Sequence, residues 1–153
     1  MFKNLKKRSE GFTIIEVLIV LAIAGLIMLI VFLAVPALQR NSRNTAVKND
    51  VANALGGVAE FQAANSGVMP TAATTTAGVV TYTGAAGSNP TTARVQGATL
   101  VSSTVAAPAA AAPALGSIVI SLGFTCTTTN TRAAAALYAI ETTAGPIRQC
   151  QDS

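Results

Sequence analysis

The chain has 153 residues, of which 51% are hydrophobic and 10% are charged, and it contains no histidine. Its length allows one compact domain with a membrane element and excludes two full domains. Most of the net charge of +4 lies ahead of Gly11, where four of the ten basic residues are found. Beyond Gly11 six basic and five acidic side chains remain. This nearly neutral remainder does not support DNA binding by charge.

A long apolar segment follows this basic leader. Residues 11–38, GFTIIEVLIVLAIAGLIMLIVFLAVPAL, carry one charged side chain, Glu16. The 22 uncharged residues from Val17 to Leu38, as a helix rising about 1.5 Å per residue, span about 33 Å, the thickness of a bilayer core. Basic residues that flank a first apolar helix stay in the cytoplasm. We therefore expect a transmembrane helix with the leader inside and everything after it outside.

Glu16 is the most informative residue of this segment. An ionised acid within a membrane costs about 2.5 to 3.5 kcal/mol on insertion scales, so a partner is expected. A cut between Gly11 and Phe12 would create a positive α-amino group one helical turn from Glu16, on the same face. The two charges would then compensate one another in the membrane.

Residues 10–17, EGFTIIEV, resemble the processing site of type IV prepilins. In that family a prepilin peptidase cuts after the glycine, the new N-terminal phenylalanine is methylated, and the glutamate pairs with the terminal amine of a neighbouring subunit. The resemblance implies cleavage between Gly11 and Phe12, N-methylation of Phe12 and an assembly role for Glu16. Gly25 also matches a common pilin glycine, whereas Pro36 comes about one turn later than the family's usual proline.

The helix is predicted to continue beyond the membrane. Apolar residues recur at helical spacing among polar ones: Val47, Val51, Leu55, Val58 and Phe61. Asn65 to Gly67, followed by Pro70, form the stop signal. A helix from Phe12 to about Asn65 is longer than a globular core needs. Within it, Gly56 and Gly57 indicate a bend, a close contact or a tolerated pair opposite the packed stripe.

The remainder of the chain favours strands. Alternating apolar residues predict a strand at Ile118–Phe124, and weaker patterns predict Val79–Thr83, Ala98–Val105 and Ala135–Glu141. We expect an antiparallel sheet of three or four strands packed on the amphipathic half of the helix, an α+β pilin-like fold. The proline-rich segment 106–113 predicts an exposed loop. The threonine clusters 74–76 and 127–131 predict solvated turns.

Cys126 and Cys150 would face an oxidising compartment, where a pair in a small domain forms a disulfide. Such a bridge stabilises the fold by about 3 to 4 kcal/mol in the chain-entropy model. The alternative is a pair of metal ligands, but histidines, a CxxC motif and clustered carboxylates are all missing from the sequence. We expect neither a metal nor a cofactor.

These observations predict a leader at 1–11, a membrane and assembly helix at 12–38, an amphipathic helix at 39–66 and a head at 67–153. The resemblance implies a structural subunit of a type IV pilus, most like a major pilin. Such a precursor sits in the cytoplasmic membrane, and the processed subunit joins a helical homopolymer outside the cell. Its partners would be the prepilin peptidase, the pilus assembly machinery and other copies of itself, in support of motility, adhesion or DNA uptake.

Several alternatives remain. A minor pilin and a type II secretion pseudopilin share the N-terminal signature, although such pseudopilins typically lack the disulfide and carry a calcium-binding acidic loop. A conventional secretory signal cut near Val35–Ala37 is disfavoured because the apolar run is too long and contains Glu16. A simple membrane anchor for an extracellular binding domain gives no reason for the spacing of Gly11, Phe12 and Glu16. An enzyme is not expected, because the scattered acids Asp50, Glu60, Glu141 and Asp152 form no catalytic pattern.

Overall fold

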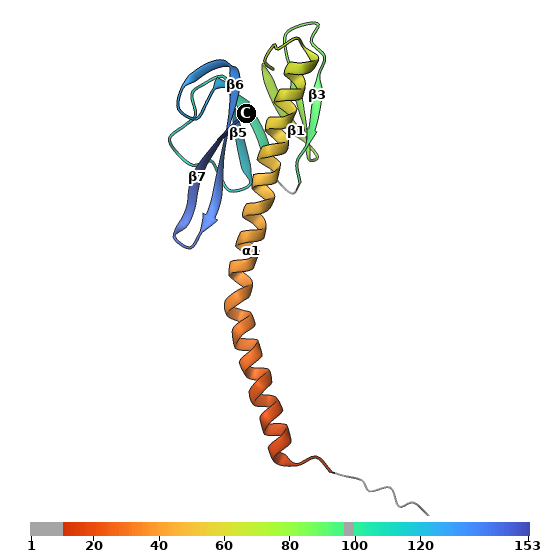
Figure 1. Cartoon of the computed structure of the whole chain (residues 1–153), viewed down its shortest axis with the longest axis vertical. Coiled ribbons are helices and arrows are strands. Elements are labelled where there is room, and N and C mark those ends of the chain that lie inside the picture. Colours follow the sequence, from red (N-terminus) through yellow and green to blue (C-terminus); the bar gives the residue numbers. More distant parts are fainter. Residues whose placement is uncertain (1–10, 97–99) are drawn as a thin grey trace, which may run out of the picture. The chain divides into compact units, whose positions relative to one another are not determined.

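The computed structural model describes residues 11–96 and 100–153, and it consists of one long helix and seven strands within these ranges (Figure 1). Most of the predicted leader, residues 1–10, lies outside the described residues, as do residues 98 and 99 of one predicted strand. The chain divides into two compact units, residues 1–39 and residues 40–153. The α+β fold class expected from the sequence is confirmed.

Helix α1, Ile14–Ala64, has 51 residues and continues through Pro36. It begins two residues later than predicted, because Thr13 caps its first turn. It ends where the Asn-Ser-Gly signal predicts. Gly67 has a φ of 83° and donates its backbone N–H to the carbonyl of Gln62 at 2.7 Å, which satisfies one of the last carbonyls of the helix.

The strands form two sheets. The first is antiparallel in the order β1-β2-β3, and the second has the order β4-β5-β6-β7. The bounds are β1 Ala72–Thr76, β2 Val79–Thr83, β3 Thr91–Arg94, β4 Leu100–Thr104, β5 Ser117–Phe124, β6 Thr129–Thr142 and β7 Gly145–Asp152. The prediction of one antiparallel sheet was wrong in two respects: there are two sheets, and β4 pairs with β5 in parallel. A parallel pair requires a crossover, and the exposed segment 106–113 belongs to that connection.

The prediction of solvated turns at 74–76 and 127–131 was wrong for the first segment and for part of the second. Residues 74–76 belong to β1, and residues 129–131 begin β6. Threonine is β-branched and suits a half-buried strand when a hydrophobic neighbour is available, as Thr75 has in Val80 across the β1–β2 pair. Strands β3 and β7 were not predicted, because β3 has only four residues and β7 contains Pro146, which weakens any strand pattern.

The two sheets meet through side chains rather than through a backbone ladder. The Thr75 hydroxyl accepts the Val101 N–H at 2.9 Å and donates to the Val101 carbonyl at 2.8 Å. The Ser103 hydroxyl accepts the Ala73 N–H at 2.7 Å. Hydroxyl groups therefore satisfy backbone groups at the junction of β1 and β4 that would otherwise be unpaired.

One hydrophobic core joins both sheets to the C-terminal part of α1. It includes the predicted helical stripe, of which Val51, Val58 and Phe61 are fully buried, together with Ile118 and Ile120 of β5. The Tyr82 hydroxyl donates to the helix carbonyl of Ala54 at 2.6 Å, and burial raises the pKa of this tyrosine. The helix is thus fixed to β2 by a hydrogen bond as well as by apolar contact.

The two central glycines have different environments. A Cβ on Gly57 would lie 2.4 Å from Cε2 of Tyr82 and 2.8 Å from Cβ of Ala93, whereas a Cβ on Gly56 would meet nothing within 4 Å. Gly57 therefore allows the helix to approach β2 and β3 closely, and Gly56 lies on the open face. The sequence left a close contact and a tolerated open position undecided, and each applies to one of the two residues.

A polar contact joins the helix to β6 near residue 141. Arg43 donates from Nε and Nη2 to the Glu141 carboxylate at 2.8 and 2.6 Å. The neighbouring Asn44 donates to the Glu141 carbonyl and accepts its N–H, both at 2.8 Å. The hydrogen bonds from Arg43 lower the pKa of Glu141. Two consecutive helix residues therefore bind every polar group of one strand residue.

Candidate functional site

The residues predicted for processing lie together at the beginning of α1. Gly11, Phe12 and Thr13 precede the helix in non-helical conformation and are exposed. A hollow of about 360 Å³ is lined by these three residues and Glu16. The peptide bond between Gly11 and Phe12 is therefore outside the helix and exposed, and the Glu16 carboxylate lies about one turn away.

Thr13 and Glu16 form a reciprocal pair at the helix start. The Thr13 backbone N–H and hydroxyl both donate to Oε2 of Glu16, at 2.9 and 2.7 Å. In return the Glu16 N–H lies 3.4 Å from the Thr13 hydroxyl oxygen. This is a capping box, in which a threonine and a glutamate three residues later satisfy the free N–H groups of the first turn.

The capping role of Thr13 was not predicted. The Thr-x-x-Glu spacing ahead of an apolar run is the signal that could have found it. The consequence concerns Glu16, whose carboxylate binds within its own chain even while the leader is still attached. The predicted partner, the α-amine of Phe12, exists only after cleavage and is not part of this uncut chain.

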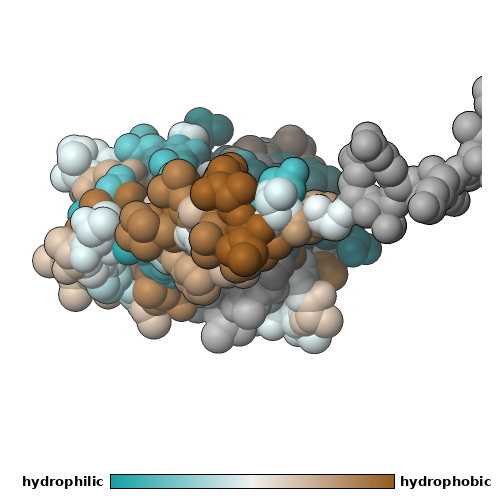
Figure 2. Space-filling model, turned by 90° about the horizontal axis from the view of Figure 1, so that it is seen from below, coloured by the Kyte–Doolittle hydropathy of each residue, from teal (hydrophilic) through white to brown (hydrophobic). Residues whose placement is uncertain are grey.

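Apolar side chains surround this first turn and continue to the end of the segment. Every residue from Gly11 to Gln39 is exposed, and the side chain of Phe12 is 88% exposed. Figure 2 shows hydrophobic side chains gathered at the surface where the helix is viewed end-on. One helix, α1, is long and apolar enough to cross a membrane in the described part of the chain. So much exposed apolar surface requires lipid or another protein around it.

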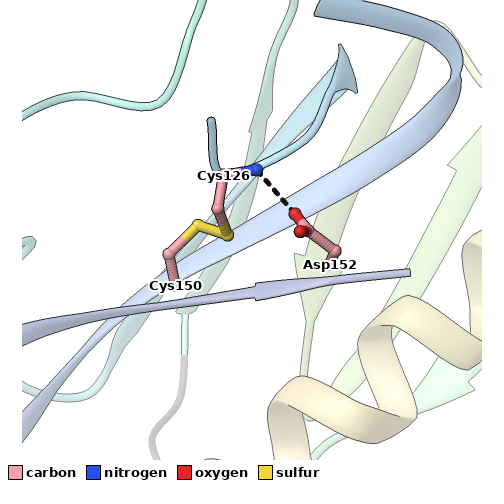
Figure 3. A group of neighbouring side chains, drawn as sticks. All are labelled: Cys126, Cys150 and Asp152. Atoms are coloured by element: carbon pink, nitrogen blue, oxygen red, sulfur yellow. Dashed lines mark hydrogen bonds between the residues drawn. A yellow bond between two sulfur atoms is a disulfide. The ribbon is translucent and has the colours of Figure 1, made fainter. Parts of the chain in front are cut away.

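The two cysteines of the head form a disulfide between Cys126, after β5, and Cys150, on β7 (Figure 3). The Asp152 carboxylate accepts the N–H of Cys126 at 2.6 Å, beside the bridge. Of the described residues, only these three bring together three potential metal ligands. Because the two sulfur atoms are bonded to one another, they are not available as thiolate ligands.

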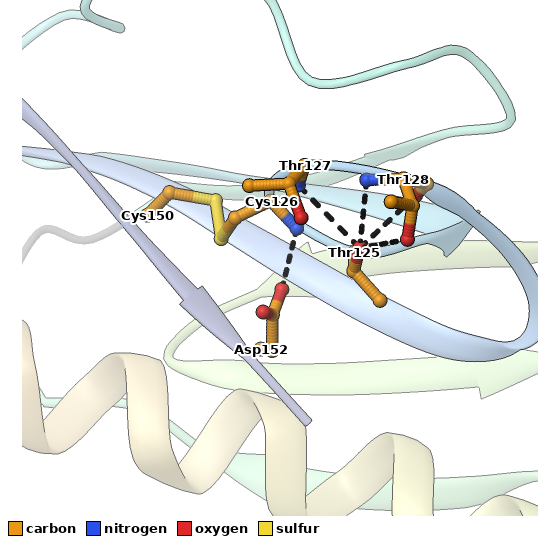
Figure 4. The surroundings of a disulfide bond; sticks show 6 residues. All are labelled: Thr125, Cys126, Thr127, Thr128, Cys150 and Asp152. Atoms are coloured by element: carbon orange, nitrogen blue, oxygen red, sulfur yellow. Dashed lines mark hydrogen bonds between the residues drawn. A yellow bond between two sulfur atoms is a disulfide. The ribbon is translucent and has the colours of Figure 1, made fainter.

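The turn before β6 is closed by its own threonines (Figure 4). The Thr125 hydroxyl accepts the N–H of Thr128 at 2.9 Å and lies 2.8 Å from its hydroxyl oxygen. Hydroxyl-to-backbone bonds of this kind stabilise tight turns. Directly after β7, Ser153 exchanges two hydrogen bonds with Ala134, and its hydroxyl accepts the Ala134 N–H at 3.0 Å. The disulfide, the threonine turn and these bonds together hold the last strand in place.

Comparison with known protein families identifies one segment of the chain. Residues 6–32 match the family model described as the prokaryotic N-terminal methylation motif. The match covers the predicted cleavage site, the capping box and the exposed apolar helix as far as Phe32. No curated protein and no solved structure matches the chain. The N-terminal segment is therefore similar to a prokaryotic N-terminal methylation motif, and the match does not extend to the head.

Proposed function

We propose that this chain is the precursor of a filament subunit of the type IV pilin class. A prepilin peptidase cuts between Gly11 and Phe12, and the new N-terminus of Phe12 is methylated. The observation that supports this most directly is the match of residues 6–32 to the N-terminal methylation motif. The exposed bond after Gly11 and the adjacent Glu16 carboxylate are consistent with it.

The apolar helix has two successive environments in this proposal. The precursor resides in the cytoplasmic membrane with its leader inside and its head outside. After processing, subunits leave the bilayer and pack their helices against one another. Because helix contact and lipid contact are both apolar, the exchange requires little free energy in either direction. The exposed segment up to Gln39 then becomes the interior of a homopolymer.

Glu16 sets the stagger between neighbouring subunits. Before cleavage its carboxylate is held by Thr13. After cleavage the amine of a neighbouring Phe12 is a stronger partner, because it carries a full positive charge in a surrounding of low dielectric constant. A helix inserted out of register would leave the carboxylate without that charge, which is costly.

Among subunits of this class, the disulfide favours a major pilin over a type II secretion pseudopilin. Those pseudopilins typically lack a bridge near the C-terminus, whereas Cys126 and Cys150 are joined here. The head would then coat the filament and contact surfaces, cells or DNA. Motility, adhesion and DNA uptake are all functions of such filaments.

The test is the intact mass of this protein in fibres sheared from cells that express it. We expect the mass of residues 12–153 plus one methyl group, with both cysteines oxidised. Abundant recovery supports a major subunit, and trace recovery beside another main subunit supports a minor one. A dispersed extracellular product that begins near Leu38, after a conventional secretory cut, would contradict the proposal.

A further inference from the structure

Two charged side chains of the head, on different elements, have no hydrogen bond or ion pair with the described residues: Glu60, which is exposed, and Arg148, which is partly buried. The four acidic residues after the membrane segment are Asp50, Glu60, Glu141 and Asp152. The Asp50 carboxylate accepts the N–H of Gln96 at 2.6 Å, Glu141 binds Arg43, and Asp152 accepts the N–H of Cys126. Glu60 is exposed and makes no hydrogen bond or ion pair with the described residues.

Arg148 of β7 is the corresponding cation. Its Nε is shielded from water and has no hydrogen-bond partner among the described residues. The side chain is only partly exposed, whereas Lys48, Arg94 and Arg132 are exposed to solvent. Arg40, also partly exposed, is within electrostatic reach of Glu141. An anion that binds Arg148 therefore displaces less water than one that binds an exposed cation. Its electrostatic attraction to the arginine is also stronger, because the local dielectric constant is lower.

The two residues lie on different faces of the head. Arg148 pairs across the sheet with Ala139, which alternates with the core residue Tyr138. Its side chain is therefore on the side of the sheet away from the core, the side that carries Cys150. Glu60 lies on α1, on the face opposite the buried residues Val58 and Phe61.

The surface around Glu60 allows another molecule to approach closely. Gly56, one turn before it, faces open space. The other exposed residues of this helix face are small or short: Ala52, Asn53, Ala59 and Ala63. A small-residue face does not specify a partner by itself, but the single carboxylate within it does specify a charge.

We propose that Glu60 of one copy binds Arg148 of the next copy in the filament. This inference rests on the proposed filament function. The contact joins two different surfaces of the same molecule. When two copies bind, each therefore keeps one unused half of the pair for a further copy, and the contact propagates without closing. It adds a charge-specific contact between heads to the packing of the apolar helices.

Reciprocal charge reversal tests the pair. We expect Glu60→Arg and Arg148→Glu each to reduce the yield of sheared fibres about tenfold or more. Losing one partner of a close interfacial charge pair weakens binding by at least this factor in other complexes. The double variant is expected to restore most of the yield, because the reversed charges again attract. Arg94→Glu, an exposed arginine on the edge strand β3, is the matched control and is expected to assemble normally.

Each outcome decides something different. Normal fibre yield in both single variants overturns the contact, and so does a double variant that assembles no better than the single ones. An equal loss in Arg94→Glu means that net charge, not this pair, controls assembly. Fibres that lack the wild-type chain contradict the proposed function itself, whatever the variants do.

Folding is checked first, because Arg148 is partly buried. The melting temperature and the intact disulfide of each full-length variant in detergent show whether the head is native. Glu60→Arg alters an exposed side chain, so its fibre yield reports the contact directly. If Arg148→Glu does not fold, Glu60→Arg with Arg148→Gln replaces the double variant, and partial recovery is expected because like-charge repulsion is removed.

Discussion

The apolar helix up to Gln39 and the head from Arg40 onward obtain their stability from different sources. The first has every described side chain exposed, so its apolar surface requires lipid or another protein around it. The second buries its own core, shared by α1 and both sheets. Changes in the first region should therefore alter processing and assembly, and changes in the second should alter the folding of a single chain.

The largest effect is expected at the cleavage site. Gly11→Leu should leave nearly all of the protein as the uncut precursor, because a bulky side chain occupies the position next to the bond that is cut. Intact mass of the membrane fraction measures this. Since the head does not depend on Gly11, its melting temperature should be unchanged. Mature-size protein in this variant would mean that another protease makes the cut.

Glu16 comes next and separates charge from capping. Glu16→Ala and Glu16→Gln should both be processed and remain in the membrane. Their fibre yield should fall about tenfold or more, because both lack the charge that we propose sets the register between subunits. The glutamine still accepts from Thr13, so it keeps the cap. Fibre yield of Glu16→Gln at the wild-type level would show that the cap matters and the charge does not.

In the head, loss of the disulfide should have the largest effect on folding. The bridge closes a loop with a sequence separation of 24 residues. In the chain-entropy model such a loop stabilises the fold by about 3.5 kcal/mol. Cys126→Ser with Cys150→Ser should lower the melting temperature in non-reducing detergent solution and leave cleavage intact. An unchanged melting temperature would mean that the bridge does not restrain the unfolded chain.

The glycine pair provides a matched comparison within one helix. Gly57→Ala should destabilise the head by about 1 to 3 kcal/mol, because the new methyl group collides with Tyr82. Gly56→Ala should stabilise it slightly, by up to about 1 kcal/mol, because alanine favours a helix and the site is open. Chemical denaturation of the full-length proteins measures both. Equal effects would contradict the close contact at Gly57.

The smallest effect is expected from the contact at Glu141. Its pKa is lowered in the folded protein by Arg43. The stabilisation is therefore fully present above the ordinary glutamate pKa and is lost as the pH falls through the lowered value. Glu141→Gln should reduce the pH dependence of the melting temperature in this acidic range. An identical pH profile in wild type and variant would show that the ion pair contributes nothing.

The two regions also differ in how well the sequence predicts them. The helix, its stop signal and the strands at Val79–Thr83 and Ile118–Phe124 follow from local periodicity, and the structure has them close to the predicted bounds. The strands that were missed, β3 and β7, have weak patterns of their own. They form because β2 and β6 provide partners for their backbone groups. Pairing with a neighbouring strand overrides a weak local preference.

The candidate processing site is local, so it could be found almost entirely from the order of the residues. Gly11, Phe12 and Glu16 lie within a turn and a half of one another, and even Thr13, which was missed, follows a spacing rule. Three other features could not be found in this way. They are the contrast between Gly56 and Gly57, the parallel pairing of β4 with β5, and the position of Arg148 and Glu60 on different faces of the head. Each depends on which distant segment packs beside a residue, and short-range periodicity carries no information about that.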